Sequence, residues 1–544
     1  MMRSWSFLAV LALGFVANNN AVDAACNNFS NRFQKALEGV CVCTEASCDT
    51  VSNAYLTTPA AQLSVYTTSK AGDRLAPSTV AINTTKPTTS DFIIEPTVTY
   101  QKMIGFGGAF TDAAAINIYK LKTTSLQQKV LDAYYAESGL QYTVGRIPIS
   151  SSDFSTSIYS YNPVVDDFDM KHFSIDVDRA PNSNKLDLIK RALSTTKREL
   201  SIFASSWAPP TWMTRDNSTL NCRVKGVPGE PYWKALALYY ARFIEEYQKE
   251  GINIWGITVQ NEPGKPIIQP SVWQSLRLTP EEERDFIKKD LGPLLKQKSP
   301  DIKIIAHDDQ TADIPDRMAP FKDADALKYI DGIGIHWYKN LDFFFFGLGG
   351  DYGKLVDFHN KYPDVFILGT EACEGYLPSW LGTGVGVKLQ QPEQIWYRAE
   401  NYARDIIEDV ANFASGWTDW NLALDTNGGP NWAKNFVDSP IIIDEVSGTE
   451  FYKQPMYYIL GHLSKFIPAG SIRINLKSNS KKNWDNIHRA AFLTPEKRVV
   501  VVFCNRRGDP ATVAFETPLQ QSVTVTIPAR ATQTYIFQAS AIAK

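Results

Sequence analysis

Eight short apolar segments alternate with amphipathic helical patterns between residues 99 and 470. Each apolar segment has the length of a β-strand, and alternation of this kind predicts parallel strands joined by crossover helices. Thr279 and Glu282, with Pro280 between them, form a typical helix start. Eight such units close a (β/α)8 barrel. The expected strands are 104–106, 143–149, 200–205, 254–259, 302–306, 333–336, 365–368 and 415–420.

Polar or aromatic residues follow each expected strand. A barrel strand is buried on both faces and should be apolar throughout, so polar residues at one end indicate a shared pocket at the carboxyl ends of the strands. In chain order, the strand ends are Thr111–Asp112, Ser152–Asp153, Trp207, Asn261–Glu262, Asp308–Gln310, His336–Tyr338, Glu371 and Asp419–Asn421.

The two flanks of the barrel predict a second, all-β unit. Residues 51–98 and 471–544 are rich in Thr, Val and Ile. Ser522–Ile527 alternates with period two, and Val499–Phe503 is a continuous apolar run of strand length. We expect a β-sandwich built from both ends of the chain and packed beside the barrel at 99–470.

The amino terminus predicts entry into the secretory pathway. Residues 1–24 resemble a signal peptide, with Arg3 ahead of an apolar segment and small residues before the cleavage expected after Ala24. Sequons at Asn28, Asn83 and Asn217 predict glycosylation. A net charge of −3 without a basic stripe argues against nucleic acid as a partner.

Four cysteines lie within residues 25–50, namely Cys26, Cys41, Cys43 and Cys48. This density in a secreted chain predicts two disulfides in a small β segment. We favour Cys26–Cys41 with Cys43–Cys48, although the spacing leaves other pairings open. Zinc is the competing interpretation, but the spacing fits it poorly and no histidine lies nearby. We expect no metal and no cofactor, since Gly105–Gly108 also lacks the spacing of a phosphate loop.

Glu262 and Glu371 end the fourth and seventh expected strands. Cleavage of a glycosidic bond needs an acid that protonates the leaving oxygen and a carboxylate that attacks or stabilises the sugar carbon. We predict Glu262 as general acid/base and Glu371 as nucleophile, with Tyr338 as a hydrogen-bond donor to Glu371. The alternatives are a structural carboxylate at Glu262 and a core aromatic at Tyr338.

Several motifs give the chain a family resemblance: Gly105–Asp112, Arg146–Ser155, Ser206–Trp212, Gly416–Leu424 and His462–Pro468. In these motifs the chain resembles the glucosylceramidases of glycoside hydrolase family 30, over essentially the whole mature chain. The resemblance implies retaining hydrolysis of glucosylceramide to glucose and ceramide, with the same two glutamates in the same roles.

The resemblance also implies a glucose site. Its residues would be Asp153, Trp207, Asn261, Trp420 and Asn435 around the sugar, with Gln310 and Trp337 at the mouth. A carboxylate can accept hydrogen bonds from two hydroxyls, and indole faces suit the C–H groups of a sugar ring. Each tryptophan has core packing as its alternative.

Location and partners follow from the same resemblance. It implies the lysosomal lumen, a glucosylated lipid at a membrane surface, a saposin-like activator protein and anionic lipid. Phe343–Phe346 either inserts into a lipid surface or packs against a neighbouring loop. The competing functions are a secreted β-glucanase or xylanase of the same barrel family, which would be extracellular, and a non-catalytic carbohydrate-binding protein.

Overall fold

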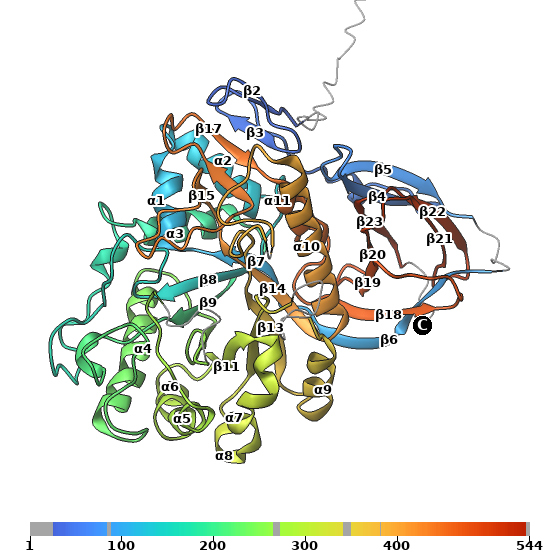
Figure 1. The fold of residues 1–544 in the computed structure, drawn as a ribbon. Helices are drawn as coiled ribbons and strands as arrows, with labels where there is room; N and C mark the ends of the chain where they lie inside the picture. The colour runs from blue at the N-terminus through green and yellow to red at the C-terminus, as the bar shows by residue number, and fades with distance from the viewer. Residues whose placement is uncertain (1–25, 84–88, 265–271, 341–349, 381, 540–544) are drawn as a thin grey trace, which may run out of the picture.

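The computed structural model describes residues 26–83, 89–264, 272–340, 350–380 and 382–539. The expected signal peptide and the run Phe343–Phe346 lie outside these residues. Figure 1 shows a barrel with a β unit beside it and a small sheet at one end. Within the described residues, no helix is long and apolar enough to cross a membrane.

All eight predicted barrel strands are confirmed. They pair in parallel and close in the order β10-β11-β12-β13-β14-β7-β8-β9. The strands are β7 (Gly105–Ala109), β8 (Val144–Ile149), β9 (Ser201–Ser206), β10 (Gly256–Thr258), β11 (Lys303–Gln310), β12 (Gly332–His336), β13 (Phe366–Glu371) and β14 (Ala414–Asn421).

Helices surround this barrel, and the predicted capping box begins one of them, where Thr279 and Glu282 bond reciprocally. The helices are α1 (Asp112–Lys120), α2 (Thr124–Tyr135), α3 (Lys185–Thr195), α4 (Pro231–Lys249), α5 (Pro280–Phe286), α6 (Gly292–Lys298), α7 (Ala319–Lys322), α8 (Ala324–Leu327), α9 (Gly353–Lys361), α10 (Pro392–Ala411) and α11 (Pro455–Ser464).

Close approach of β7 to β8 explains the glycine-rich start of the barrel. A Cβ at Gly107 would lie 1.7 Å from the carbonyl oxygen of Val144. No side chain fits at that distance, so this glycine permits the strand pairing.

The β unit beside the barrel draws its strands from both ends of the chain, as predicted. Its nine strands are ordered β22-β21-β6-β18-β19-β20-β23-β4-β5. They are β4 (Gln62–Ser69), β5 (Ala76–Ala81), β6 (Phe92–Lys102), β18 (Ile472–Ser478), β19 (Ile487–Leu493), β20 (Arg498–Asn505), β21 (Ala511–Glu516), β22 (Ser522–Ile527) and β23 (Ala531–Gln538).

The strand β20 is apolar throughout because both of its faces are buried. Val499 and Val501 lie in the core of the β unit, whereas Val500 and Val502 belong to the core shared with the barrel. The continuous apolar run predicted as a strand therefore packs against both units, one on each face.

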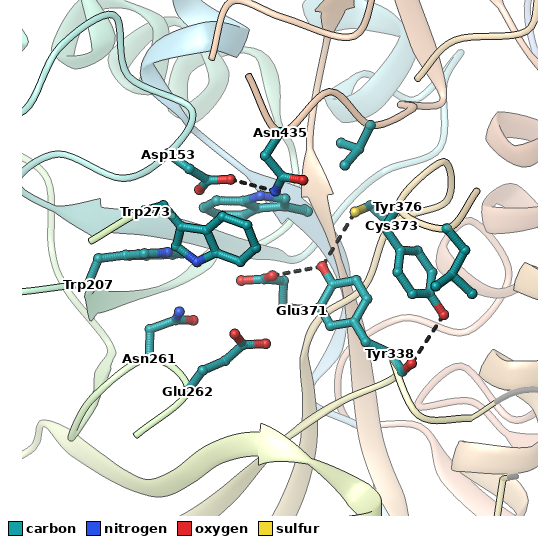
Figure 2. A pocket seen from close by; sticks show the side chains of 13 residues that line it. Asp153, Trp207, Asn261, Glu262, Trp273, Tyr338, Glu371, Cys373, Tyr376 and Asn435 are labelled. Atoms are coloured by element: carbon teal, nitrogen blue, oxygen red, sulfur yellow. Dashed lines mark hydrogen bonds between the residues drawn. The ribbon is translucent and has the colours of Figure 1, made fainter. Parts of the chain in front are cut away.

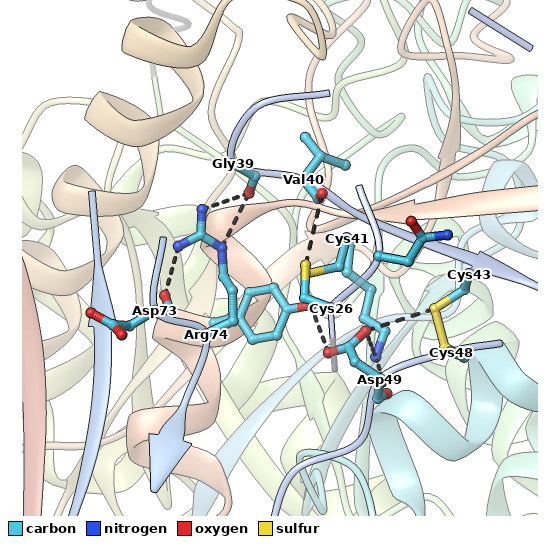
Figure 3. Close-up of a disulfide and its surroundings, with 12 residues drawn as sticks. Cys26, Gly39, Val40, Cys41, Cys43, Cys48, Asp49, Asp73 and Arg74 are labelled. Atoms are coloured by element: carbon cyan, nitrogen blue, oxygen red, sulfur yellow. Dashed lines mark hydrogen bonds and ion pairs between the residues drawn. A yellow bond between two sulfur atoms is a disulfide. The ribbon is translucent and has the colours of Figure 1, made fainter. Parts of the chain in front are cut away.

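The cysteine-rich segment joins a small sheet at the carboxyl end of the barrel. Strand β3 (Cys41–Thr44) pairs with β17 (Glu450–Lys453), which continues through β16 (Ile441–Ile443) to β15 (Leu424–Asp425). The disulfides Cys26–Cys41 and Cys43–Cys48 are both confirmed, and Figure 3 shows Arg74 beside the first of them. The short strands β1 (Phe29–Ser30) and β2 (Lys35–Ala36) form the hairpin ahead of it.

Candidate active site

A pocket opens where the carboxyl ends of the barrel strands meet, and Figure 2 shows its lining. It encloses about 730 Å³, open solvent at its mouth included. Thirteen side chains line it, contributed by strand ends and the loops that follow them: Asp153, Trp207, Asn261, Glu262, Trp273, Tyr338, Glu371, Cys373, Tyr376, Leu377, Trp420, Asn435 and Val437.

Two of these carboxylates lie close together. One oxygen each of Glu262 and Glu371, with a ring nitrogen of His336, lie within 4.8 Å of one another. Such proximity suits a carboxylate pair that works through a covalent intermediate, for which about 5–5.5 Å is usual, and is shorter than the roughly 6.5–9.5 Å of inverting enzymes. The side chain of Glu262 is 24% exposed and that of Glu371 only 8%. Glu262 is thus the one nearer to the pocket mouth.

Glu371 is held by two donors. Its Oε1 accepts a hydrogen bond of 2.7 Å from the hydroxyl of Tyr338, and its Oε2 is ion-paired with Arg146. Arg146 is fully buried in β8 and also donates to Asn261 Oδ1 at 2.8 Å and to Asp308 Oδ2 at 3.0 Å. Burial alone would lower the pKa of Arg146, but Asp308 and Glu371 raise it. This cation therefore fixes three side chains at once, of which Asn261 and Glu371 line the pocket.

Glu262 is held from the other side. Its Oε1 accepts from Gln310 Nε2 at 2.9 Å and contacts His336 Nδ1 at 3.1 Å, while His336 Nε2 lies 3.0 Å from Asp308 Oδ1. Burial would lower the pKa of His336, yet Glu371, Asp308 and Glu262 together raise it to about 10. His336 is therefore an imidazolium that donates from both nitrogens. Burial opposes ionisation of Asp308, but Arg146 and His336 outweigh it and hold its pKa well below the usual range.

The cluster of Glu262, His336 and Glu371 has metal-ligand spacing, and its electrostatics favour an ion-pair network instead. A histidine binds a metal through a deprotonated nitrogen. Here both nitrogens face carboxylates and the pKa of His336 lies near 10.

The far end of the pocket is polar and aromatic. Asp153 Oδ2 accepts from Asn435 Nδ2 at 3.0 Å and from Asn431 Nδ2 at 3.2 Å, and burial raises the pKa of Asp153 to about 7. Trp207 and Trp420 stack with centroids 4.9 Å apart. Together they form an aromatic wall beside the carboxylate, an arrangement that suits a sugar.

Two of the predicted site residues lie outside the pocket lining. Gln310 reaches the site through its bond to Glu262. Trp337 is buried away from the lining, where its Nε1 donates to the carbonyl of Cys373 at 3.1 Å and its ring packs edge-on against Tyr402. The other predicted sugar and catalytic residues all line the pocket.

Sequence reasoning missed the lining residues Trp273, Tyr376, Leu377 and Val437, and it left the direction of Cys373 open. They come from loops, where no periodicity points to a pocket. The role of Arg146 was missed as well, although a charge in the middle of an otherwise apolar strand is a visible signal.

Comparison with known proteins identifies the family. The model for the glycosyl hydrolase family 30 TIM-barrel domain matches residues 103–467, and the model for the family 30 beta sandwich domain matches residues 470–535. The chain belongs to glycoside hydrolase family 30. It is therefore a glycoside hydrolase.

Relatives within the family extend over nearly the whole chain. The lysosomal acid glucosylceramidase of Mus musculus is 36% identical over 505 residues, which cover 92% of this chain and 93% of the mouse protein. A Caenorhabditis elegans protein designated as a candidate glucosylceramidase is 35% identical over 559 residues, 99% of each chain. Among solved structures, SrfJ from Salmonella typhimurium has the same fold, with a TM-score of 0.77 at 23% identity over 88% of this chain and 99% of SrfJ.

Proposed function

We propose that this family 30 hydrolase is a retaining β-glucosidase that converts glucosylceramide to glucose and ceramide. The observation that carries the proposal is the approach of Glu262 and Glu371 to within 4.8 Å at the carboxyl ends of β10 and β13. The identity to the mouse glucosylceramidase supports the substrate.

The reaction proceeds by double displacement. Glu371 attacks the anomeric carbon while Glu262 protonates the glycosidic oxygen, so that ceramide leaves and a glucosyl ester forms on Glu371. Water then enters, gives a proton to Glu262 and attacks the same carbon. Glucose leaves with retained configuration, and Glu262 regains its proton for the next cycle.

The surrounding network prepares the two glutamates for these roles. Arg146 and Tyr338 both donate to Glu371, which fixes the orientation of its carboxylate for attack. The His336 imidazolium and Gln310 orient the carboxyl of Glu262. Asn261 is held by Arg146 beside the acid, where its amide can donate to a sugar hydroxyl.

The glucose occupies the polar end of the pocket. Asp153 and Asn435 would bond to its hydroxyls, and Trp207 and Trp420 would form its aromatic wall. Trp337, which does not line the pocket, would position Cys373 without touching the sugar. Gln310 would act through Glu262.

An apolar aglycone fits the rest of the pocket. Trp273, Tyr376, Leu377 and Val437 line it with carbon-rich surface. Further exposed apolar side chains lie on the loops after β10 and β13, with Val272 and Val385 half-exposed and Trp380 78% exposed. These surfaces support a substrate presented by a membrane, in preference to a soluble glucan.

We infer the surroundings of the enzyme from the same comparisons. The name of the mouse relative supports the lysosomal lumen as the location, and anionic lipid with a saposin-like activator are the partners we propose. The exposed positions of Asn28, Asn83 and Asn217 support glycosylation. We propose 1–24 as the signal peptide, 25–50 as the disulfide segment, 51–98 with 471–544 as the sandwich and 99–470 as the barrel.

Hydrolysis of glucosylceramide in anionic vesicles at acidic pH tests the function. The wild type should release glucose, and Glu262→Gln and Glu371→Gln should each abolish release. Glu450→Gln is the matched control, since Glu450 is a buried carboxylate in β17 that does not line the pocket. Cleavage of a soluble β-glucan by the wild type, with no glucose from the lipid, would assign the chain to the polysaccharide-cleaving alternative.

A further inference from the structure

Two loops contribute most of the apolar lining of the pocket apart from the aromatic wall, and Trp273 contributes the rest. The β13 loop, residues 372–391, contributes Tyr376 and Leu377, and the β15 loop, residues 426–440, contributes Val437. In Figure 2, Tyr376 and Tyr338 lie on the side of the pocket away from Trp207 and Asp153. The positions of these two loops therefore determine the shape of the space left for an aglycone.

One arginine ties both loops to the barrel. Arg398 of α10 is fully buried, and its Nη1 donates to the carbonyl of Gly386 at 2.8 Å and is ion-paired with Asp438. Its Nη2 donates to the carbonyl of Gly384 at 2.6 Å, and its Nε donates to Thr383 Oγ1 at 3.0 Å. Every one of these acceptors belongs to the β13 loop or the β15 loop.

A buried glutamate completes this attachment. Glu374 is almost fully buried and accepts from Thr383 Oγ1 at 2.7 Å and from Asn401 of α10 at 2.7 Å. Its carbonyl accepts from the backbone N–H of Asp438 at 2.8 Å. We call Arg398, Thr383, Glu374 and Asp438 the loop clamp.

We propose that Arg398 is a positioning residue which, through the loop clamp, sets the selectivity of the enzyme for the aglycone. The proposal rests on the β-glucosidase function proposed above. The clamp touches neither Glu262 nor Glu371, and its bonds end on the loops that present Tyr376, Leu377 and Val437.

The β13 loop also contacts the catalytic side at Tyr338, whose hydroxyl lies 3.4 Å from Cys373 Sγ. The hydroxyl of Tyr376 donates to the carbonyl of Tyr338 at 3.2 Å, and the two rings pack with centroids 4.9 Å apart. A displaced β13 loop would move Tyr376 first, and the effect on the glutamates would be secondary. Weakening the clamp should thus impair a large apolar aglycone more than a small soluble one.

Thr383→Val is the sharpest test, because valine keeps the shape of threonine and removes the hydroxyl that joins Arg398 to Glu374. We expect kcat/KM for glucosylceramide in vesicles to fall about threefold to tenfold relative to kcat/KM for a small soluble aryl β-glucoside, because part of the free energy of the two lost buried hydrogen bonds is expressed in aglycone binding. The loss should be mainly in KM. Thr383→Ser keeps the hydroxyl and should restore the ratio.

Thr534→Val is the matched control. Thr534 is fully buried in β23, and its hydroxyl lies 2.8 Å from His462 Nδ1, remote from the pocket lining. This variant should lower Tm without changing the ratio of the two kcat/KM values. Arg398→Lys should change the ratio of the two kcat/KM values more than Thr383→Val does, and calorimetry shows whether the variant folds. If it does not fold, the proposal is tested by Thr383→Val only.

Two results would overturn the proposal. One is an equal loss for both substrates in Thr383→Val, and the other is a change of ratio in Thr534→Val as large as in Thr383→Val. Failure of the underlying function is distinguishable, because the wild type itself would then release no glucose from glucosylceramide.

Discussion

The hydroxyl of Tyr338 donates to Glu371 Oε1 at 2.7 Å, and the two residues come from neighbouring barrel strands. His336 lies opposite Glu371 in the β12–β13 register, so Tyr338 projects two residues beyond the point where the ladder ends. The short approach follows from strand register and needs no long loop. It is therefore a rigid contact, as the positioning of a nucleophile requires.

Tyr338→Phe should lower kcat/KM about 10-fold to 150-fold, because a hydrogen bond to an ionised carboxylate contributes about 1.5–3 kcal/mol. Steady-state hydrolysis of a soluble β-glucoside measures the loss. Tyr458→Phe is the matched control, since the Tyr458 hydroxyl donates to the carboxylate of Asp49 at 2.8 Å away from the pocket. A similar kinetic loss in both variants would show that Tyr338 acts only through stability.

The imidazolium of His336 should make stability depend on pH. Its pKa is raised to about 10 by Glu371, Asp308 and Glu262 against the opposing effect of burial, from about 6.5 in an unfolded chain. The contribution of the His336 charge to the free energy of unfolding is fully present below about pH 6.5 and is lost as the pH rises toward 10. The Tm difference between the wild type and His336→Asn should therefore shrink over this range.

His462→Asn is the control for that titration. His462 is also buried, but burial lowers its pKa to about 3, so it stays neutral from pH 6 to pH 10. Its Tm difference from the wild type should be constant from about pH 8 to pH 10, because the histidine of the unfolded chain is neutral there as well. A constant difference for His336→Asn as well would contradict a charged His336.

The barrel could be predicted because each strand carries its own signal, an apolar run that ends in a polar residue. The same signal located Asp153, Asn261, Glu262 and Glu371 at the pocket. This signal could not show that Tyr338 lines the pocket while Trp337 does not, because both residues follow β12. The direction of each side chain depends on where the hydrogen bonds between β12 and β13 end. Strand alternation no longer applies past that point.

Contacts between segments that lie far apart in the chain could not be predicted from the sequence. Arg398 meets Thr383 and Asp438 only because α10 passes beneath both loops. Likewise, β3 pairs with β17, some four hundred residues later in the chain, as Cys43 opposite Phe451 illustrates. Neither pairing leaves a local pattern, because periodicity reports burial and not the identity of the partner.

The two disulfides should stabilise the fold unequally. Cys26–Cys41 spans 15 residues and Cys43–Cys48 only 5. In the chain-entropy account the longer loop gains more, about 3 kcal/mol against about 2 kcal/mol. Urea unfolding of the double serine variants should therefore give the lower free energy of unfolding for Cys26→Ser with Cys41→Ser. The reverse order would mean that residual structure in the unfolded chain outweighs loop length.

Glu262 has a backbone conformation that favours glycine, with φ at +42°. An L-residue in the left-handed region costs about 1–2 kcal/mol, a strain that functional sites retain. Glu262→Gly should thus unfold with a free energy about 1 kcal/mol higher than Glu262→Ala, although both are inactive. Glu371 lies inside β13 and has no positive φ. There Glu371→Gly should have a free energy of unfolding about 0.5–1 kcal/mol lower than that of Glu371→Ala. Denaturant unfolding of the four variants measures both differences, and the same sign at both positions would refute a strained Glu262.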